Sequence, residues 1–192
     1  MRIEIIGNIA SGKTTLANVL SNKCHSIYEN FQENPFWESF YQAPDVYSFE
    51  TEITFTLQHY HQIKRELAKK IRFVCDFSLT LDRIYADITL TGRRKEIYKQ
   101  VLTELELEVG YPDTLVYLDC PEELLLERIR LRGRDTEQSI SIDYLKALSA
   151  GIYHSVQEVE STKVIRIDSA TLDFAHRIED QATVKNTILL EF

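Results

Sequence analysis

Five short runs of apolar and β-branched residues recur along the chain, and longer stretches with helical spacing separate most of them. The runs cover residues 2–6, 24–29, 71–77, 114–119 and 163–168. Strands that are apolar almost throughout are typical of a parallel sheet buried on both faces, and their alternation with helices indicates an α/β protein. The pattern therefore predicts a doubly wound α/β fold.

The stretches between these runs predict the helices. Apolar residues recur near helical spacing in the longest stretch, as Ile53, Leu57 and Ile63 illustrate. Helices are expected to begin within residues 11–15 and to cover residues 47–70, 79–90, 93–109, 121–131, 141–160 and 172–185. Because no repeat, low-complexity tract or linker interrupts the pattern, we expect one domain over residues 1–192.

Composition and charge narrow the classes of function. The 192-residue chain carries a net charge of −8, whereas proteins that bind nucleic acid usually have a basic surplus, so no nucleic-acid partner is expected. No apolar run approaches the roughly 18 residues of a membrane span, and the N-terminus lacks the pattern of a signal peptide. These features predict a cytoplasmic protein with no membrane partner. Cys24, Cys75 and Cys120 lack metal-binding spacing and are expected to be buried, reduced thiols.

The most specific motif follows the first apolar run. Residues 7–14 read GNIASGKT and match the phosphate-loop pattern GxxxxGK[ST] between a predicted strand and a predicted helix. In such a loop, backbone amides and the helix N-terminus surround phosphate oxygens. Lys13 is expected to reach the β- and γ-phosphates of ATP, and the Thr14 hydroxyl to ligate Mg²⁺. The expected cofactor-binding residues of the loop are Gly7, Asn8, Ile9, Ala10, Ser11, Gly12, Lys13, Thr14 and Thr15.

An arginine-rich segment at residues 128–138 is a second candidate element. It contains Arg128, Arg130, Arg132 and Arg134, with Gly133 near the end of a predicted helix. Arginine binds phosphoryl oxygens in bidentate fashion and neutralises charge during phosphoryl transfer, so the segment is interpreted as a lid. GTPases, motor ATPases and small-molecule kinases all use a phosphate loop. The short chain and the lack of a guanine-reading NKxD motif favour a small-molecule kinase.

Four segments together resemble the deoxyribonucleoside kinase family, namely the phosphate loop, residues 28–52, residues 75–82 and the lid. The resemblance extends to about residue 175. It implies a P-loop NTPase fold with a five-stranded parallel sheet and helices on both faces. It also implies an enzyme that transfers the γ-phosphoryl group of ATP to the 5′-hydroxyl of a deoxynucleoside. Family members are typically homodimers that pair through the helices expected here over residues 47–70 and 79–90.

The resemblance assigns roles on the acceptor side. Glu29 matches the glutamate that takes the proton of the 5′-hydroxyl, which is chemically sensible for a general base. Tyr41 and Glu137 match the pair that holds the 3′-hydroxyl of the sugar. Asp76 matches an acidic residue near Mg²⁺, and Asp82 matches an acidic residue that faces the base.

On the donor side, Arg128, Arg132 and Arg134 match the lid arginines of the family. The segment 165–174, which contains Asp168, resembles the loop that cradles the donor adenine. The catalytic residues that the resemblance implies are Lys13, Glu29, Arg128 and Arg132.

One departure from the family removes a cation. The family has an arginine between an acidic residue and a serine, but the motif reads Asp76-Phe77-Ser78 here. That arginine normally helps to place the 5′-hydroxyl, and losing one buried charged contact costs a few kcal/mol of transition-state stabilisation. The candidates for a substitute are Arg83, Arg93 and Arg94, and spacing selects none of them.

Other departures concern the base. Glu52 and His59 stand where the family has a glutamine and an arginine, two helical turns apart on one face. An ionised Glu52 only accepts hydrogen bonds and suits the adjacent donors of guanine, whereas a protonated Glu52 also suits adenine or cytosine. Ala86 replaces an aromatic ring that relatives often carry, which leaves room for a larger base. A purine is therefore the preferred substrate.

Two other functions stay open. The first is a related P-loop kinase that phosphorylates a modified nucleoside or a nucleoside monophosphate, although residues 29–60 contain no arginine or lysine for a second phosphate. The second is a nucleotide-binding regulatory subunit with weakened catalysis. Phe77 motivates that alternative, while retention of Lys13, Thr14 and Glu29 opposes it.

Overall fold

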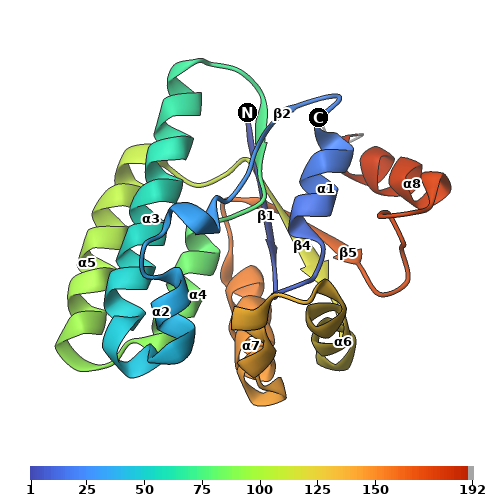
Figure 1. The fold of residues 1–192 in the computed structure, drawn as a ribbon. Coiled ribbons are helices and arrows are strands. Elements are labelled where there is room, and N and C mark those ends of the chain that lie inside the picture. The colour runs from blue at the N-terminus through green and yellow to red at the C-terminus, as the bar shows by residue number, and fades with distance from the viewer. Residues whose placement is uncertain (190–192) are drawn as a thin grey trace.

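The computed structural model describes residues 1–189, so the last three residues of the domain expected over 1–192 lie outside the described part. Its centre is a five-stranded sheet in the order β2-β3-β1-β4-β5, in which every neighbouring pair is parallel (Figure 1). The strands are β1 (Arg2–Gly7), β2 (His25–Ile27), β3 (Phe73–Cys75), β4 (Thr114–Asp119) and β5 (Lys163–Asp168). The α/β fold expected from the alternating pattern is confirmed.

Helices connect the strands and form the lid region. They are α1 (Lys13–Leu20), α2 (Trp37–Gln42), α3 (Pro44–Ala68), α4 (Leu79–Thr89), α5 (Gly92–Val109), α6 (Glu122–Arg132), α7 (Ile142–Glu158) and α8 (Ile178–Leu189). Two 3₁₀ segments cover Phe31–Glu33 and Asp135–Ser139. The second of them follows Gly133, whose left-handed backbone (φ 65°) ends α6. The lid is therefore a helix, a glycine turn and a short 3₁₀ segment.

Two helix boundaries differ from the expectation. The helix expected over 47–70 begins at Pro44, whose fixed φ suits a first helical turn, and α2 precedes it as a separate helix. The last helix, expected over 172–185, begins only at Ile178. In the residues before it, the Asp173 carboxylate accepts a hydrogen bond from the amide of His176, and such local bonds favour a turn over a helix.

Both faces of the sheet are covered, as two successive residues of β1 demonstrate. Ile5 packs in a buried cluster with Leu16 and Val184, on the side of α1 and α8. Ile6 packs with Leu81 and Leu148 on the opposite side, where α4 and α7 lie. Figure 1 shows α1 and α8 on one side of the sheet, with α3, α4 and α5 on the other. Adjacent strand residues point to opposite faces, so an unbroken apolar strand requires this double cover.

The order of the strands determines where a ligand binds. The central strand β1 lies between β3 and β4, and in doubly wound sheets a crevice forms outside the carboxyl ends of the strands at this point. The phosphate loop follows β1, Glu29 follows β2 and Asp76 follows β3. The topology thus brings the three strongest candidates of the sequence to one edge of the sheet.

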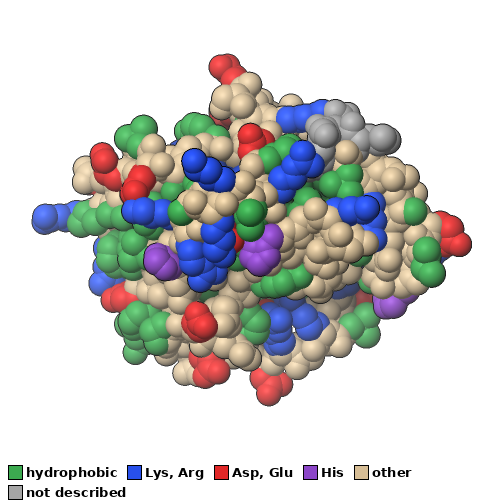
Figure 2. Space-filling model, turned by 90° about the horizontal axis from the view of Figure 1, so that it is seen from above, with side chains coloured by type: hydrophobic (Ala, Val, Ile, Leu, Met, Phe, Trp, Pro, Cys, Tyr) green, Lys and Arg blue, Asp and Glu red, His purple; other side chains and the backbone are tan. Residues whose placement is uncertain are grey.

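The face of the molecule at the amino ends of the strands lies opposite the edge where these candidate residues gather. Basic and acidic side chains are interspersed on it (Figure 2). Among the described residues, no helix combines the length and the apolar character needed to cross a bilayer. Cys24, Cys75 and Cys120 are buried and free, which confirms that expectation.

Candidate active site

A cavity of about 480 Å³ lies at the carboxyl ends of β1, β2 and β3. Most of the residues predicted from the sequence line it, and they come from the phosphate loop, from α3 and α4 and from the lid. These residues are Ile9, Ala10, Ser11, Gly12, Lys13, Thr14, Thr15, Glu29, Tyr41, Glu52, His59, Asp82, Arg128, Arg132, Arg134 and Glu137. The predicted residues outside its wall are Gly7, Asn8, Asp76 and Asp168.

Two glycines give the phosphate loop its shape. A Cβ atom on Gly7 would lie 2.6 Å from Ser11 Oγ and 3.0 Å from the carbonyl oxygen of Leu118, so only glycine fits there. Gly12 has a φ of 102°, which glycine adopts without steric cost, and it immediately precedes α1. The ring of Phe174 packs against Gly12 on its open side. These contacts hold the loop at the N-terminus of α1, where a helix binds anions.

Asn8 and Lys13 fix the loop from within. The amide of Asn8 donates to the carbonyl of Leu145 at 2.8 Å and to Ser149 Oγ at 2.9 Å, so this side chain ties the loop to α7. Lys13 Nζ donates to the carbonyls of Gly7 at 3.0 Å and Asn8 at 3.1 Å. Burial lowers the pKa of Lys13, and neighbouring carboxylates oppose that effect. The loop is preformed, and Lys13 is held beside the cavity that it lines.

Thr14 and Asp76 form an oxygen-rich pair at the base of the cavity. Thr14 Oγ1 donates to Asp76 Oδ2 at 2.6 Å, and Asp76 Oδ1 accepts the backbone amide of Glu29 at 2.6 Å. No group of three or more His, Cys, Asp or Glu side chains in residues 1–189 has the arrangement of a metal site. Mg²⁺ is usually held by one or two protein oxygens together with substrate phosphates and water, and Thr14 and Asp76 would supply two such oxygens.

Glu29 is the carboxylate that meets the cavity beside the phosphate loop. About a third of its side chain (36%) is exposed. Burial raises the pKa of Glu29 above its usual value, and the nearby His59 and Lys13 offset this rise only in part. Its backbone amide is fixed by Asp76. Glu29 therefore has a fixed backbone position, and its side chain lines the same cavity as the phosphate loop.

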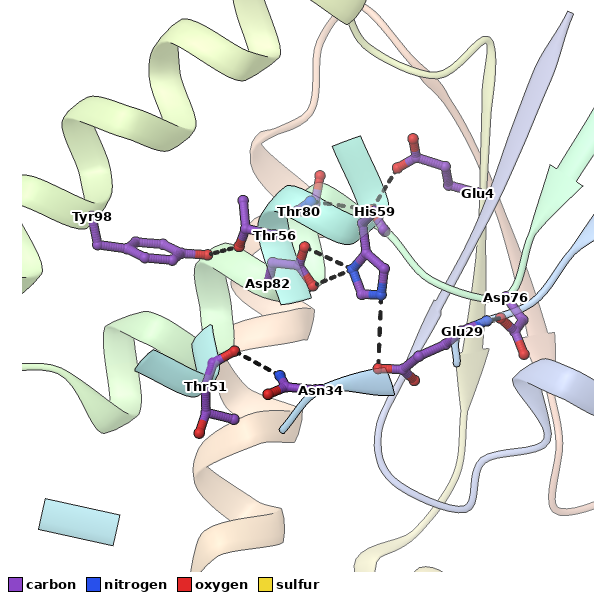
Figure 3. A network of polar contacts seen from close by, with 11 residues as sticks. Glu4, Glu29, Asn34, Thr51, Thr56, His59, Asp76, Thr80, Asp82 and Tyr98 are labelled. Carbon is purple, nitrogen blue, oxygen red and sulfur yellow. Dashed lines mark hydrogen bonds and ion pairs between the residues drawn. The ribbon is translucent and has the colours of Figure 1, made fainter. Parts of the chain in front are cut away.

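His59 makes close contacts with Asp82 of α4, as Figure 3 shows, and with Phe77 in the segment before α4. Its Nδ1 lies 2.9 Å and 3.0 Å from the two carboxylate oxygens of Asp82. Its ring stacks on Phe77, with a centroid distance of 4.1 Å and an angle of 9° between the planes. Burial lowers the pKa of His59, but the carboxylates of Asp82 and Glu29 outweigh this and raise the pKa overall. Phe77, which departs from the family motif, thus packs against one face of the His59 ring.

Glu52 lies deep in the cavity and is held by a threonine. Thr89 Oγ1 donates to Glu52 Oε1 at 2.9 Å, and Glu52 is only 6% exposed. Burial raises the pKa of Glu52 to about 8. At neutral pH the side chain is therefore protonated, and it both donates and accepts hydrogen bonds. Sequence analysis considered an ionised and a protonated Glu52. The structure favours the protonated state, which does not select guanine over adenine.

The argument from Ala86 was wrong. Ala86 is buried in the core between α3 and α5 and does not line the cavity. Tyr85, one position earlier, lines it instead, three residues after Asp82 on the same helix face. Ala86 therefore leaves no extra room for a base. Helical spacing from Asp82 was the signal that would have identified Tyr85.

Sequence analysis also missed Phe55 and Tyr144, which line the cavity. Phe55 stands between Glu52 and His59 on the inner face of α3, so helical spacing predicts its position. Tyr144 lies in the first turn of α7 after the lid, and no local pattern marks it. Trp37 and Phe40 also line the cavity, whereas Phe36 does not.

The lid arginines are bound to different partners. Arg132 and Arg134 both pair with Glu137, the latter at 3.0 Å, and Glu137 is only 4% exposed. The guanidinium of Arg134 also lies 4.2 Å from the centre of the Phe31 ring. Arg128 donates to the carbonyl of Ser169 at 2.7 Å. Glu137 thus links the arginines expected at the phosphates to the position expected at the sugar.

Tyr41 lies in α2 and packs against a buried cluster that includes Leu125 and Ile129 of α6. Burial and the negative charge of Glu137 raise the pKa of Tyr41, so its hydroxyl stays protonated at neutral pH. Tyr41 and Glu137 both line the cavity, as the family resemblance implied. The pair offers one donor and one acceptor to a small ligand.

Asp168 has a local role. It is exposed, and its Oδ1 accepts the amides of Ala170 at 2.9 Å and Thr171 at 3.2 Å. These bonds form the turn after β5 and lower the pKa of Asp168. The same segment ends at Phe174, which packs on the phosphate loop. Asp168 shapes the loop that resembles the donor-adenine loop, and its side chain does not line the cavity.

None of the three arginines considered as a substitute for the missing family arginine lines the cavity. Arg83 forms an ion pair with Glu106 of α5. Arg93 and Arg94 are exposed, and Arg94 lies over the ring of Phe49. The side chain of α3 that lies beside Glu29 is instead His59, whose Nε2 lies 3.8 Å from Glu29 Oε1.

Comparisons with known proteins agree with this geometry. The chain is 30% identical to a deoxyguanosine kinase of Bacillus subtilis over 182 residues, which cover 90% of this chain and 88% of the relative. It is 29% identical to a deoxyadenosine kinase of Dictyostelium discoideum, over 86% of this chain and 71% of the relative. A solved structure of deoxyadenosine kinase from M. mycoides with bound dATP superposes with a TM-score of 0.83, at 23% identity, over 98% of this chain and 100% of that one.

The family profile described as deoxynucleoside kinase matches residues 3–192. The match spans the phosphate loop, the helices that carry Glu52 and Asp82, and the lid. The structural likeness independently supports the P-loop fold with its five-stranded parallel sheet. The chain belongs to the deoxynucleoside kinase family.

Proposed function

We propose that this protein transfers the γ-phosphoryl group of ATP to the 5′-hydroxyl of a deoxynucleoside. The observation that carries the proposal is the link through Asp76. One buried carboxylate accepts both the Thr14 hydroxyl of the phosphate loop and the amide of Glu29. The group that holds the donor and the group that deprotonates the acceptor therefore meet at one point of one cavity.

The donor site is built from the phosphate loop and the lid. The loop amides and Lys13 surround the β- and γ-phosphates, and the helix dipole of α1 adds to their attraction. Thr14 and Asp76 would hold Mg²⁺, which neutralises phosphate charge when it is bound. Arg132 and Arg134 line the same cavity and supply positive charge to the transferred group.

The acceptor site occupies the rest of the cavity. Glu29 takes the proton of the 5′-hydroxyl while that oxygen attacks the γ-phosphorus. Tyr41 and Glu137 hold the 3′-hydroxyl, and Glu52 and Asp82 lie where the base enters. Positioning of the two reactants accounts for most of the rate enhancement in phosphoryl transfer, so the rigid placement of these groups is the main contribution of the protein.

A purine is the proposed base. The relatives described above are named as deoxyguanosine and deoxyadenosine kinases. A protonated Glu52 offers one donor and one acceptor, which match a paired donor and acceptor on guanine, adenine or cytosine. The preference for a purine therefore rests on the relatives. Because neither feature separates guanine from adenine, both purine deoxynucleosides are proposed as substrates.

A homodimer acting in the cytoplasm completes the proposal. The residues of α4 are buried or half-buried, and Arg83 and Asp87 pair with charged side chains of α5. The helices α3 and α5 instead carry exposed apolar side chains, among them Leu57 and Leu107. The contact between subunits is therefore proposed on the outer face of α3 and α5, rather than on α3 and α4.

The test is an ADP-release assay with ATP and Mg²⁺ against deoxynucleosides, ribonucleosides and their monophosphates. We expect turnover of purine deoxynucleosides, and a loss of roughly 10²- to 10⁴-fold in kcat for Glu29→Gln, the range attributed to general base catalysis. Turnover of monophosphates alone would replace the proposal by a nucleotide kinase. ATP binding without turnover of any acceptor would favour the regulatory alternative.

A further inference from the structure

One buried nitrogen next to Glu29 has no hydrogen-bond partner. His59 is 3% exposed, and its Nε2 is a buried polar atom without a partner in the described residues. This atom points toward Glu29, with 3.8 Å between Nε2 and Oε1 (Figure 3). A buried polar atom without a hydrogen-bond partner is costly, so its place in a ligand cavity requires an explanation.

The orientation of the imidazole is fixed on its other sides. Asp82 holds Nδ1 with both carboxylate oxygens. Phe77 covers one face of the ring at 4.1 Å, and Phe55 stacks near it at 5.9 Å with an angle of 27° between the planes. The ring cannot turn without losing these contacts. Nε2 therefore stays directed at Glu29.

The same contacts leave little of His59 for a nucleobase. Its Nδ1 edge is used by Asp82, and its faces are used by aromatic rings. Only the Nε2 edge is free, and it faces the acid–base carboxylate. The polar atoms of His59 are therefore poorly placed to recognise a base, which is the role that the resemblance suggested.

We infer that His59 is a positioning residue for Glu29, held on Asp82 and Phe77 so that its Nε2–H orients the acid–base carboxylate. This inference rests on the proposed kinase function. A contraction of less than an ångström brings Nε2 within hydrogen-bond distance of Oε1 and leaves Oε2 for the 5′-hydroxyl. His59 thereby replaces, from α3, the arginine that Phe77 has displaced.

The proton balance is simple. The O–H bond of the 5′-hydroxyl breaks and its proton passes to Glu29. The 5′-oxygen forms a bond to the γ-phosphorus, and the bond from that phosphorus to the bridging oxygen breaks and releases ADP. His59 keeps its protons throughout and acts only by direction and charge.

Two substitutions of His59 separate its contacts. Asparagine places an amide nitrogen near the position of Nδ1 and can keep the bond to Asp82, whereas glutamine places one near the position of Nε2 and can still reach Glu29. We expect His59→Asn to lower kcat about 10- to 100-fold, the cost of a misplaced catalytic group, with the nucleoside KM and the ranking of bases unchanged. His59→Gln should lose less than His59→Asn. The matched control His61→Asn, at an exposed position of the same helix, should equal the wild type.

A double-mutant cycle tests whether His59 acts through Glu29. In the Glu29→Gln background, His59→Asn should reduce kcat no further, because the group that it positions has gone. A full additional loss in that background would contradict the inference. A changed ranking of bases with kcat retained would assign His59 to base recognition instead. Thermal unfolding of each variant identifies any loss that comes from misfolding, and His59→Gln then remains as the milder comparison.

A measurement without turnover keeps the inference separate from the proposed function. In ¹⁵N NMR spectra of the histidine rings, we expect Glu29→Gln to shift the Nε2 signal of His59 and to leave its Nδ1 signal in place. Equal shifts of both nitrogens, or none, would overturn the inference. If the wild type phosphorylates no nucleoside but Nε2 responds selectively, the proposed function fails while the coupling of His59 to Glu29 stands.

Discussion

The hydroxyl of Thr14 donates to the carboxylate of Asp76 across 2.6 Å, although 62 residues separate the two in the sequence. The other oxygen of Asp76 accepts the amide of Glu29. Asp76 itself is only 2% exposed. Through this one side chain, the phosphate loop after β1 and Glu29 after β2 are held in register.

Replacing Asp76 should therefore disturb metal binding and alignment together. In Asp76→Asn, the amide oxygen can still accept the Glu29 amide, but the Thr14 hydroxyl must reverse and accept from the amide nitrogen, and the negative charge that would hold Mg²⁺ is lost. We expect kcat to fall about 100-fold, as for a misaligned site, and the Mg²⁺ concentration for half-maximal rate to rise. Initial rates measured against Mg²⁺ at saturating ATP and nucleoside check this. The exposed residue Asp143 provides the control Asp143→Asn, and a wild-type Mg²⁺ profile for Asp76→Asn would refute the role of the pair.

The raised pKa of Glu52 predicts a base preference that depends on pH. Its pKa of about 8 means that the side chain is protonated below that pH and ionised above it. Below pH 8, Glu52→Gln should rank deoxyguanosine and deoxyadenosine as the wild type does, because a neutral carboxyl and an amide both donate and accept. Above pH 8, an ionised Glu52 only accepts, so the wild type should shift toward deoxyguanosine.

The measurement is the ratio of kcat/KM for the two purines, at about one pH unit below and one above the pKa. A charged acceptor is worth more than a neutral one, and about 1.4 kcal/mol corresponds to a tenfold change in the ratio. The Glu52→Gln variant is the control and should show no such change. A wild-type ratio that is constant across the same range would remove Glu52 from base selection.

Glu137 should affect the sugar more than ATP. Its carboxylate is the acceptor proposed for the 3′-hydroxyl, and it also pairs with Arg132 and Arg134. We expect Glu137→Gln to raise the nucleoside KM about tenfold, the value of roughly one lost charged hydrogen bond, without raising the KM for ATP. For a 2′,3′-dideoxynucleoside, which lacks the 3′-hydroxyl, the wild type and Glu137→Gln should have the same KM. A similar KM increase with that analogue would place Glu137 elsewhere in the mechanism.

The proposed dimer contact is tested on α3 and α5. Leu57 is 46% exposed and Leu107 is 74% exposed, and both lie on helices at the outer side of the sheet (Figure 1). Because a buried charge opposes association, Leu57→Glu with Leu107→Glu should convert a dimer to a monomer. Size-exclusion chromatography with light scattering measures the mass. Leu131→Glu, at an exposed position of α6, should leave the dimer intact, and a monomeric wild type would contradict the proposal.

The fold was predictable because its signals are local. Each strand is an apolar run, and the phosphate loop is a contiguous motif between a strand and a helix. The boundary between α2 and α3 was missed because Pro44 reads as a helix breaker until its place in a first turn is known. The start of α8 was missed because the turn around Asp173 depends on local side-chain bonds that compete with helix formation.

Most residues that line the cavity were named from the sequence, whereas the contacts between them were not. Glu29, Lys13 and Glu137 reach the cavity as the resemblance implied. The stacking of His59 on Phe77 joins α3 to the end of β3, and no spacing within one element reveals such a contact. The protonated state of Glu52 likewise depends on burial by distant parts of the chain.

The most direct test of the central claim is the structure of the product. The protein is incubated with ATP, Mg²⁺ and deoxyguanosine or deoxyadenosine, and the product is examined by ³¹P NMR with coupling to the sugar protons. The account predicts a 5′-monophosphate ester, formed in equal amount with ADP and nearly absent with Glu29→Gln. A phosphate on the 3′-hydroxyl, or ADP released without any phosphorylated nucleoside, would contradict it.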